Sequence, residues 1–403
     1  MWAMPAPFSH IGSLSMKVNE GMKKALIIGG AGFVGKYLAE YLSRECGYQV
    51  RSTKMKQETL EPEGYDVVDM NLLEKQEVVD VIENFAPDYI FHLAAQSSVA
   101  VSWSNPQLTV DVNIKGALNL LDVLKEMEYK GRVLLIGSGE EYGRIHPDQV
   151  PIVEDTVLRP GNIYAATKSC QNMLGTIYAQ AYQLELVMVR AFTHVGPRQS
   201  PQFVVSDFCK QVVEVEKGLR EPVIHVGNLK AKRDFTDVRD VIAAYECLIR
   251  QGKSGETYNV GSGKAYEIQE VLDKIIELSG REINVEVEQA RLRPIDVPII
   301  EADITKITEQ TDWKRKISLE QTLKERNICL TMCRHEEGSS GYSLVELKED
   351  GDRVFLDWNQ DGVTERYPIE FTKEELDYIQ SYQAVSVGRC ASVAVEKIRK
   401  MIV

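Results

Sequence analysis

Residues 25–35 read Ala-Leu-Ile-Ile-Gly-Gly-Ala-Gly-Phe-Val-Gly, and this stretch decides the class of fold. Its apolar start is typical of a buried parallel strand, and a helical pattern follows directly after the last glycine. The glycines fit both Gly30-x-Gly32-x-x-Gly35 and Gly29-x-x-Gly32-x-x-Gly35. In such turns one glycine permits the tight bend, a second lets the backbone approach a pyrophosphate, and a third lets helix and strand pack closely. The stretch therefore predicts a dinucleotide site at the N-terminus of a helix.

The whole chain has 403 residues and a formal net charge of −13, with the apolar and charged fractions of an ordinary globular protein. This length allows two domains, or one large domain with an appendage. The acidic balance argues against nucleic acid or an anionic membrane as a partner, and no apolar run is long enough to span a bilayer. The seven cysteines are scattered, and residues 1–21 lack a signal-peptide pattern. We therefore expect a reduced, cytoplasmic protein without a metal.

A second strand is predicted at residues 48–53, and the residues at its end bear on the choice of cofactor. A site that selects NAD(H) has an acidic residue here, which holds the ribose 2′-hydroxyl. This chain has Arg51-Ser-Thr-Lys54 instead, which favours a 2′-phosphate and therefore NADP(H), with NAD(H) as the alternative. Residues 66–70 are predicted to form a third strand, in which Asp69 is placed to accept a hydrogen bond from the adenine amino group.

Strands and helices continue to alternate along the chain. We predict a helix over residues 74–85, a strand over 89–95, a helix that begins at Asn113 and a strand over 132–136. This alternation, without an internal repeat, predicts an α/β fold with a doubly wound parallel sheet, which is the Rossmann arrangement. His92 lies inside an apolar strand, so we interpret it as a core residue rather than a catalytic base.

The residues with catalytic potential follow the last of these strands. Ser138 and Glu140 lie in Ser-Gly-Glu-Glu-Tyr-Gly, at the carboxyl end of the sheet where ligands bind in such folds. Tyr164 and Lys168 are four residues apart on a predicted helix and so share one face. An ammonium beside the phenol would lower the pKa of Tyr164 from about 10. Such a tyrosine can exchange a proton with a carbinol or ketone oxygen while hydride passes to or from a nicotinamide, and Ser138 can hydrogen-bond the same oxygen.

Taken in order, these motifs resemble the extended short-chain dehydrogenase/reductase family, in its GDP-sugar branch. The resemblance extends over residues 23–324 and is also carried by Phe91-His-Leu-Ala-Ala-Gln96 and by residues 226–235 and 293–297. It implies an NAD(P)-dependent nucleotide-sugar oxidoreductase of the epimerase/dehydratase kind. It also implies a Rossmann core followed by a smaller substrate-binding part, mainly residues 195–235 and 262–326.

The resemblance assigns roles to particular side chains. Residues 226–229 match a loop that holds guanine, Arg233 and Arg293 match arginines that grip the diphosphate, and Asp296 matches an acid that holds ribose. Planar, bidentate arginine donors suit a dianionic diphosphate. The cofactor residues implied are Gly29, Gly32, Phe33, Val34, Gly35, Lys54, Asp69, Met70, Leu93, Ala94, Ala95, Asn113, Tyr164, Lys168, Ala191 and His194. The substrate residues implied are Gln96, Ser98, Thr193, Val226, Gly227, Asn228, Arg233, Arg293 and Asp296.

Two reactions compete within the GDP-sugar branch. One of them is the reaction of the GDP-4-dehydro-6-deoxy-D-mannose reductases, which reduce a C4 ketone with NAD(P)H and give GDP-D-rhamnose. These reductases are the closer match for residues 191–200, Phe203, Gln211, 234–240 and 293–298. The alternative is the reaction of the GDP-mannose 4,6-dehydratases, because Glu140 matches the base that takes the C5 proton in those enzymes. That pattern has Thr where this chain has Ser138, and Thr193 stands where Asn is expected. An inactive nucleotide-sugar-binding regulator is a third hypothesis, against which the intact Ser, Tyr and Lys set argues.

The predicted domain plan has three parts: a flexible extension over residues 1–21, a dehydrogenase/reductase domain over 22–326 and an appended α+β module over 327–403. In the module, alternating apolar residues on both sides of Glu349-Asp-Gly-Asp352 predict a hairpin, and a helix is predicted from 373 to about 382. The sequence of the module does not indicate its role. Pairing of the helices that start near Asn113 and Tyr164 with those of a second subunit, as in relatives, leads us to expect a homodimer.

Overall fold

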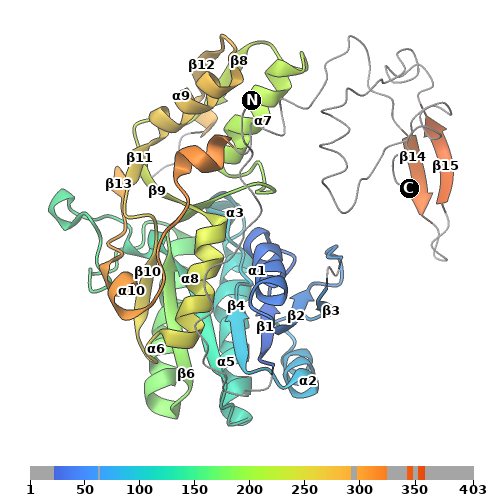
Figure 1. Ribbon diagram of the computed structural model, residues 1–403, viewed down its shortest axis with the longest axis vertical. Helices are drawn as coiled ribbons and strands as arrows, with labels where there is room; N and C mark the ends of the chain where they lie inside the picture. Colours follow the sequence, from blue (N-terminus) through green and yellow to red (C-terminus); the bar gives the residue numbers. More distant parts are fainter. Residues whose placement is uncertain (1–21, 62–63, 292–296, 325–342, 348–352, 359–403) are drawn as a thin grey trace, which may run out of the picture. The chain divides into compact units, whose positions relative to one another are not determined.

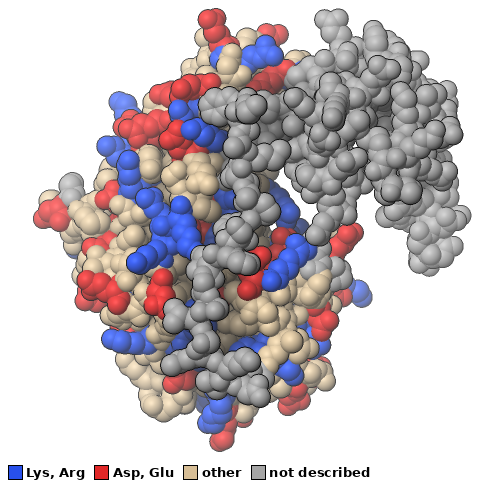
Figure 2. All heavy atoms as spheres, in the orientation of Figure 1, with Lys and Arg blue, Asp and Glu red and all other residues tan. Residues whose placement is uncertain are grey.

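The computed structural model describes residues 22–61, 64–291, 297–324, 343–347 and 353–358. The chain divides into two compact units, residues 1–330 and residues 331–403. No helix among the described residues combines the length and the apolarity that crossing a bilayer requires. On the face seen in Figure 2, groups of Lys and Arg side chains alternate with groups of Asp and Glu side chains over the described residues.

The first unit is built on a seven-stranded sheet in which every neighbouring pair of strands is parallel. The strand order is β10-β6-β5-β4-β1-β2-β3. Strands β2 and β3 therefore follow β1 on one side, and β4, β5, β6 and β10 follow in order on its other side. The doubly wound Rossmann sheet predicted from the sequence is therefore confirmed. The strands are β1 (Lys24–Ile28), β2 (Gln49–Lys54), β3 (Asp66–Asp69), β4 (Tyr89–His92), β5 (Arg132–Ser138), β6 (Glu185–Ala191) and β10 (Thr257–Val260).

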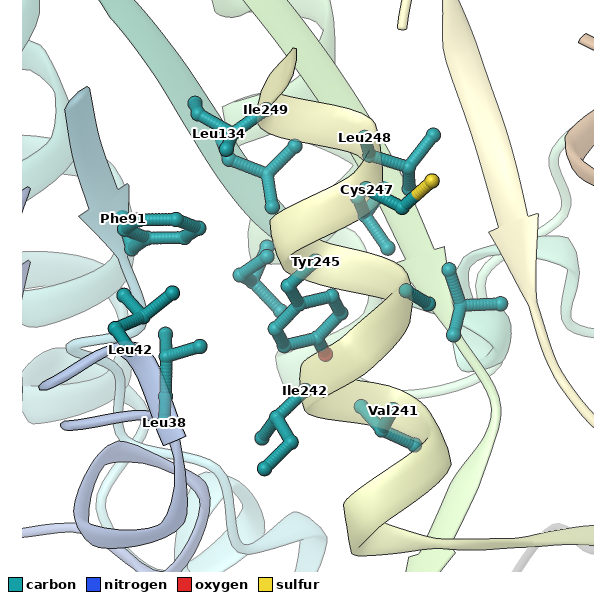
Figure 3. Packing of buried hydrophobic residues seen from close by; sticks show 14 of the residues in the cluster. Leu38, Leu42, Phe91, Leu134, Val241, Ile242, Tyr245, Cys247, Leu248 and Ile249 are labelled. Atoms are coloured by element: carbon teal, nitrogen blue, oxygen red, sulfur yellow. The ribbon is translucent and has the colours of Figure 1, made fainter. Parts of the chain in front are cut away.

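Helices cover both faces of this sheet. One face carries α1 (Phe33–Arg44) and α8 (Val238–Gln251). Figure 3 shows their core, in which Tyr245 of α8 belongs to one buried cluster with Leu38 of α1 and Phe91 of β4. The other face carries α2 (Lys75–Phe85), α5 (Gly116–Glu126) and α6 (Ile163–Tyr182). Because both faces are covered, the strands are nearly continuous apolar runs.

One predicted helix begins earlier than the sequence indicated. We expected it to start at Asn113, whereas α4 (Pro106–Val110) leads through a π-helical turn (Asp111–Lys115) directly into α5. Asn105 explains the earlier start, because its side chain accepts a hydrogen bond from the amide of Leu108 (3.2 Å) and a proline follows at the first helical position. Asn113 therefore lies inside a helical run rather than at its beginning.

A smaller part of the same unit gathers at one end of the large sheet, as the upper part of Figure 1 shows. Its central strand β9 pairs with β7, β11 and β13, while β8 pairs with β12, and α7 and α9 pack on these strands around a core of their own. Because β7 starts just after β6 ends, this part adjoins the carboxyl end of the large sheet. Its elements are β7 (Thr193–Val195), α7 (Val204–Glu216), β8 (Val223–Val226), β9 (Lys232–Asp237), β11 (Ala265–Glu267), α9 (Ile268–Ser279), β12 (Asn284–Val287) and β13 (Ile299–Ile300).

The second unit contains the hairpin that the sequence predicts. β14 (Ser343–Leu347) and β15 (Arg353–Trp358) pair in antiparallel fashion, with an irregular register after Leu344. The helix predicted over residues 373–382 lies outside the described residues.

Candidate active site

The glycine turn after β1 is closely packed. Gly29 has a φ of +93°, and a Cβ there would lie 2.6 Å from the amide nitrogen of Ala94. A Cβ on Gly35 would lie 2.5 Å from the carbonyl oxygen of Gly29, so only glycine lets α1 start this close to the strand. The turn is held by Thr53, whose hydroxyl accepts from Gly29 N (3.2 Å) and whose carbonyl accepts from Gly30 N (2.8 Å). We did not single out Thr53 in the sequence, although a hydroxyl residue near the end of the second strand was visible.

The N-terminus of α1 suits an anionic ligand. Its N-cap is Gly32, and among the described residues no side chain caps the helix. A Cβ on Gly32 would meet only the carbonyl oxygen of Gly29, at 3.3 Å. The first helical residues, Phe33 and Val34, thus begin a helix whose free N–H groups and positive dipole end suit a diphosphate. The residues present here fit the dinucleotide cofactor that the sequence implies.

The ends of β2 and β3 bring together three residues predicted to contact the adenosine part of the cofactor. Lys54 Nζ lies 2.6 Å from Asp69 Oδ1, and these two residues are register partners on the neighbouring strands. The amide of Met70 donates to the carbonyl of Lys54 (2.9 Å). Arg51 is directed elsewhere, because it pairs with Asp66 (3.2 Å) and stacks on the ring of Phe85 (4.5 Å). Of the two basic residues in this part of β2, only Lys54 therefore lies at the end of the strand.

The loop after β4 is joined to α6 by the side chain of Asn113. The amides of Leu93 and Ala94 both donate to the carbonyl of Ile28 (2.9 and 2.8 Å), and Ala95 follows. The fully buried Asn113 accepts from Gln96 N (2.8 Å) and donates to Gln96 O (3.1 Å) and Thr167 Oγ1 (2.9 Å). The Asn113 side chain, predicted to contact the cofactor, thus bonds the protein itself and links this loop to α6.

The two polar residues of this loop that are predicted to contact substrate are joined by hydrogen bonds between the Gln96 side chain and the Ser98 backbone. Gln96 Oε1 accepts from Ser98 N (2.6 Å), and Gln96 Nε2 donates to Thr109 Oγ1 (2.9 Å). Ser98 also caps α3 (Val99–Ser104) by accepting from Val101 N (3.3 Å). Both residues therefore help to shape the loop.

Ser138 and Tyr164 meet at the carboxyl end of β5. Ser138 is the last residue of β5, and Tyr164 lies in the first turn of α6, which begins after the N-cap Asn162. Asn162 accepts from Ala165 N (2.8 Å) and donates to Glu140 Oε2 (3.3 Å), so one cap positions both the helix and Glu140. We did not single out Asn162 in the sequence, although an N-cap residue directly before a helical pattern is a readable signal.

The expected lowering of the Tyr164 pKa is not found. Burial raises the pKa of Tyr164 above its ordinary value, and the hydrogen bond with Ser138 offsets this only in part. The Lys168 ammonium donates to the carbonyl of Ile136 (2.7 Å) and to Gln171 Oε1 (3.0 Å). Burial also lowers the pKa of Lys168 to about 8. The prediction was wrong because burial disfavours the charged phenolate more strongly than the hydrogen bond with Ser138 favours it.

Two adjacent glutamates have different surroundings. Glu141 is fully buried, where it pairs with Arg190 (3.2 Å), accepts from Asn172 Nδ2 (2.9 Å) and from the amide of Ser138 (2.7 Å). Glu140 is half-buried, and its charge contributes to the raised pKa of Tyr164. The charge of Glu141 raises the pKa of Tyr164 as well, but the Glu141 carboxylate is taken up by contacts with β5, β6 and α6, whereas Glu140 accepts from Asn162.

The residues after β6 connect the two parts of the first unit. β6 ends at Ala191, and Thr193 and His194 form the first two positions of β7, opposite Phe235 and Thr236 of β9. Burial lowers the pKa of His194 to about 4, so its imidazole is neutral near pH 7. The Nε2 atom of His194 lies 3.4 Å from the hydroxyl of Tyr245.

His92 belongs to the core, as we interpreted it from the sequence. It is fully buried at the end of β4, and neither ring nitrogen has a hydrogen-bond partner within the part of the chain that the structure describes. Burial lowers its pKa to about 3, with a further contribution from the charge of Lys168.

The residues predicted to hold the nucleotide lie in the smaller part of the first unit. Val226 ends β8, Gly227 and the exposed Asn228 follow, and Asn228 Oδ1 accepts from the amide of Lys230 (3.0 Å). Arg233 lies on β9, is 9% exposed and donates to the carbonyl of Val297 (2.8 Å). The other two predicted residues, Arg293 and Asp296, lie outside the described residues.

Residues 26–326 match the sequence model of the GDP-mannose 4,6 dehydratase family. The chain belongs to the GDP-mannose 4,6-dehydratase family. The resemblance that the motifs indicated is thereby confirmed, and so is the prediction of an enzyme of the NAD(P)-dependent nucleotide-sugar class.

Several members and neighbours of the GDP-mannose 4,6-dehydratase family match along most of their length. The GDP-6-deoxy-D-mannose reductase of Pseudomonas aeruginosa is 30% identical over 303 residues, which cover 75% of this chain and 95% of that protein. A GDP-mannose 4,6-dehydratase of Yersinia enterocolitica is 27% identical, with 75% and 92% covered. The solved structure of RMD from Pseudomonas aeruginosa complexed with NADPH matches with a TM-score of 0.66 at 28% identity, covering 76% of this chain and 98% of that chain. A Thermus thermophilus UDP-glucose 4-epimerase complex with NAD has a TM-score of 0.69 at 27% identity, with 77% and 100% covered.

Proposed function

We propose that this protein is a GDP-4-dehydro-6-deoxy-D-mannose reductase that uses NADPH and forms GDP-D-rhamnose. The observation that carries the proposal is the similarity to the Pseudomonas aeruginosa reductase, which extends over 95% of that relative at 30% identity. Two residues at and just after the end of β5 further favour the reductase. The dehydratase pattern has Thr where this chain has Ser138, and Gly139 can supply no acid.

The cofactor would lie along the carboxyl ends of the strands from β3 to β6. The glycine turn and the start of α1, with Phe33 and Val34, would hold the diphosphate. Lys54, beside Asp69 and Met70, would face the adenosine end and carries the positive charge that a 2′-phosphate requires. Leu93, Ala94, Ala95, Ala191 and His194 would line the remaining length, with NAD(H) as the alternative cofactor. When bound, the nicotinamide supplies the hydride for C4.

The chain's own groups would deliver the proton. Because burial raises the pKa of Tyr164, its phenol is protonated near pH 7, which is the form that a reductase needs for the ketone oxygen. The Ser138 hydroxyl would bond the same oxygen. The Lys168 ammonium, fixed by the carbonyl of Ile136, would balance the charge left on Tyr164.

The substrate would extend from this centre into the smaller part of the first unit. Gln96, Ser98 and Thr193 would lie near the sugar, and residues 226–228 would hold guanine. Arg233 would bind the diphosphate together with Arg293, and Asp296 would bind ribose. This assignment rests on the family resemblance and on the charge of the arginines.

A GDP-mannose 4,6-dehydratase is the second candidate, and Glu140 is the observation that favours it. This half-buried carboxylate accepts a hydrogen bond from Asn162 (3.3 Å), and its charge contributes to the raised pKa of Tyr164. A dehydratase needs a base over C5 once C4 is oxidised, whereas a reductase needs no such base.

Glu140→Gln separates the two reactions, because it preserves the shape of the side chain and removes the base. We expect this variant to retain most of its NADPH-dependent reduction of the 4-keto sugar. We also expect wild-type protein given GDP-mannose alone to accumulate no 4-keto product. Tyr164→Phe is the matched control, since it should impair either reaction. Conversion of GDP-mannose by wild type, abolished in Glu140→Gln, would establish the dehydratase instead, and turnover of any GDP-sugar would exclude an inactive regulator.

We also infer that the protein forms a homodimer through α6 and its neighbours. Met173 and Ile177, one turn apart on α6, are 56% and 55% exposed. Trp103 of α3 and Leu108 of α4 are 45% and 43% exposed, and both helices pack beside α6. Large apolar side chains gathered on neighbouring helices are typical of a subunit interface.

A further inference from the structure

The strand that leads to the proposed guanine loop is completed by a side chain. One edge of β8 pairs with β12, and its other edge presents the backbone of His225. The buried Gln211 of α7 takes the place of a neighbouring strand there, because its Oε1 accepts from His225 N (2.9 Å) and its Nε2 donates to His225 O (3.0 Å). The amide of one side chain thus fixes the strand directly before Val226 and Gly227.

Gln211 is in turn linked to an ion pair. Gln211 Nε2 also donates to Asp207 Oδ2 (2.8 Å), which lies one turn earlier on α7. The same oxygen of Asp207 accepts from Arg291 Nη1 (2.8 Å), and Arg291 Nε donates to Glu288 Oε2 (2.9 Å). Glu288 follows β12, and its other oxygen lies 3.2 Å from His225 Nδ1. Hydrogen bonds therefore connect His225, Gln211, Asp207, Arg291 and Glu288 in turn around the end of β8, and the two end members, His225 and Glu288, lie next to each other without a hydrogen bond between them; we call this arrangement the polar ring.

The ring also sets the position of backbone next to the loop. A Cβ on Gly227 would lie 2.8 Å from the carbonyl oxygen of Arg291, so the two backbones are in close contact. Arg291 is fixed from one side by this contact and from the other by Asp207. The side chains of Asp207 and Arg291 are 22% and 37% exposed, so we expect the pair to add little to overall stability and to act mainly on the position of Arg291.

We propose that Asp207, Gln211 and Arg291 are positioning residues that set the affinity for the guanosine diphosphate part of the substrate. They hold the turn at residues 226–228 in the conformation that receives the base, and they take no part in the chemical step at Tyr164. This inference rests on the proposed GDP-sugar function and deepens it, because it assigns nucleotide affinity to a polar ring on α7, β8 and the residues after β12.

Asp207→Asn and Arg291→Gln, singly and combined, test the proposal. Each change removes the ion pair and keeps the size of its side chain close to the original. Lys75→Gln is the matched control, because it breaks a 2.7 Å ion pair with Glu126 that joins α2 to α5. GDP affinity measured by calorimetry is compared with NADPH affinity, with the melting midpoint, and with KM and kcat for the 4-keto sugar.

We expect each single variant to bind GDP roughly 3- to 10-fold more weakly, the range for residues coupled in one polar network. KM for the GDP-sugar should rise by the same factor, while kcat and NADPH affinity stay at the wild-type values. The double variant should bind GDP no more weakly than the single variant with the lower affinity. Arg291→Lys should recover part of the lost GDP affinity. Lys75→Gln should change none of these quantities.

Unchanged GDP affinity in both single variants would overturn the inference, and so would a loss that appears equally in kcat and NADPH affinity. Failure of the proposed reaction gives a different result. Wild-type protein that binds GDP without reducing the ketone would refute the reductase, and the GDP affinities of the variants would still decide the role of the ring. Wild-type protein that does not bind GDP would refute both.

Discussion

Tyr164 and Tyr178 lie on the same helix, and both are buried, but their hydroxyls have different partners. Tyr178 donates to Asp122 Oδ1 (2.6 Å) on α5, a contact that joins two helices. Tyr164 interacts with Ser138 at the carboxyl end of the sheet, which is where ligands bind in folds of this kind. Tyr178 thus joins two helices, whereas Tyr164 lies where we propose that the reaction takes place.

Replacing Tyr164 by Phe keeps the ring and removes the proton. We expect kcat to fall by about 10²- to 10⁴-fold, the usual contribution of general acid–base catalysis, with little change in stability. Steady-state kinetics with NADPH and the 4-keto sugar measure the effect. Tyr178→Phe, the same change on the same helix, should leave kcat within about twofold of wild type, and a Tyr164→Phe enzyme that is equally active would refute the mechanism.

Lys54 is the residue at which we expect cofactor choice to be decided. Its ammonium lies 2.6 Å from Asp69, so in the protein alone its charge is already paired. A 2′-phosphate, with two negative charges, would compete with that single carboxylate for the ammonium. The basic side chain would then favour NADP(H) through a contact that NAD(H) cannot make.

Lys54→Gln should weaken NADPH binding at least several-fold more than NADH binding, because only NADPH loses a charged partner. Fluorescence titration with both cofactors measures the two affinities. Arg51→Gln is the control, since Arg51 pairs with Asp66 away from the strand end and its loss should affect both cofactors alike. Equal losses for both cofactors in Lys54→Gln would remove this residue from the 2′-phosphate site.

At the scale of an element, α8 shows how one cap joins three parts of the first unit. Asp237 ends β9, opposite Val195 of β7, and serves as the N-cap of α8 by accepting from Arg239 N (2.8 Å). Its carboxylate also accepts from the Arg239 guanidinium (2.8 Å) and from Thr322 Oγ1 (2.7 Å). Burial would raise the pKa of Asp237, but these hydrogen bonds outweigh it and hold the pKa below its ordinary value.

Asp237→Asn should lower the free energy of unfolding by about 1–3 kcal/mol near pH 7, the scale of hydrogen bonds to a charged group. Because the folded pKa is depressed, the stabilisation is present above the unfolded pKa of about 3.9 and is lost as the pH falls through the folded value. Urea denaturation should therefore show a constant difference from about pH 7 to 5 and a smaller one below about pH 4. Asp273→Asn is the control at pH 7, because Asp273 is exposed and accepts from Gln269 Nε2 (2.7 Å), and its replacement should change the free energy of unfolding by less than about 0.5 kcal/mol.

At the scale of the whole molecule, the exposed apolar side chains of α6, α3 and α4 bear on its assembly. Met173 and Ile177 lie on the helix that carries Tyr164 and Lys168; the latter two are buried and the former two are exposed. Covering Met173 and Ile177 in a dimer would remove large apolar side chains from water and would also hold α6 from its outer side.

Ile177→Glu should convert a dimer into a monomer, since an unpaired carboxylate buried at an apolar interface costs several kcal/mol. Sedimentation velocity measures the change in mass. Val287→Glu is the matched control, because Val287 of β12 is 58% exposed but lies away from α6, so this variant should keep the wild-type mass. A monomeric wild-type protein, or a dimeric Ile177→Glu variant, would contradict the interface.

The sequence by itself determined the first five strands of the large sheet, the glycine turn, the helix that carries Tyr164 and Lys168, and the family. These features follow from local rules: the apolar period selects strand or helix, and glycine spacing selects the turn. Even the missed start at Pro106 has a local signal in the capping Asn105.

Only the tertiary structure decided which of these residues are buried and what they touch. Burial reversed the expected shift of the Tyr164 pKa, joined Asn113 to Gln96 and Thr167, and separated Glu141 from its neighbour Glu140. Asn113 and Thr167, for example, lie 54 positions apart in the chain. Desolvation and partner choice depend on elements that meet only when the sheet and its helices assemble, so no local pattern of residues encodes them.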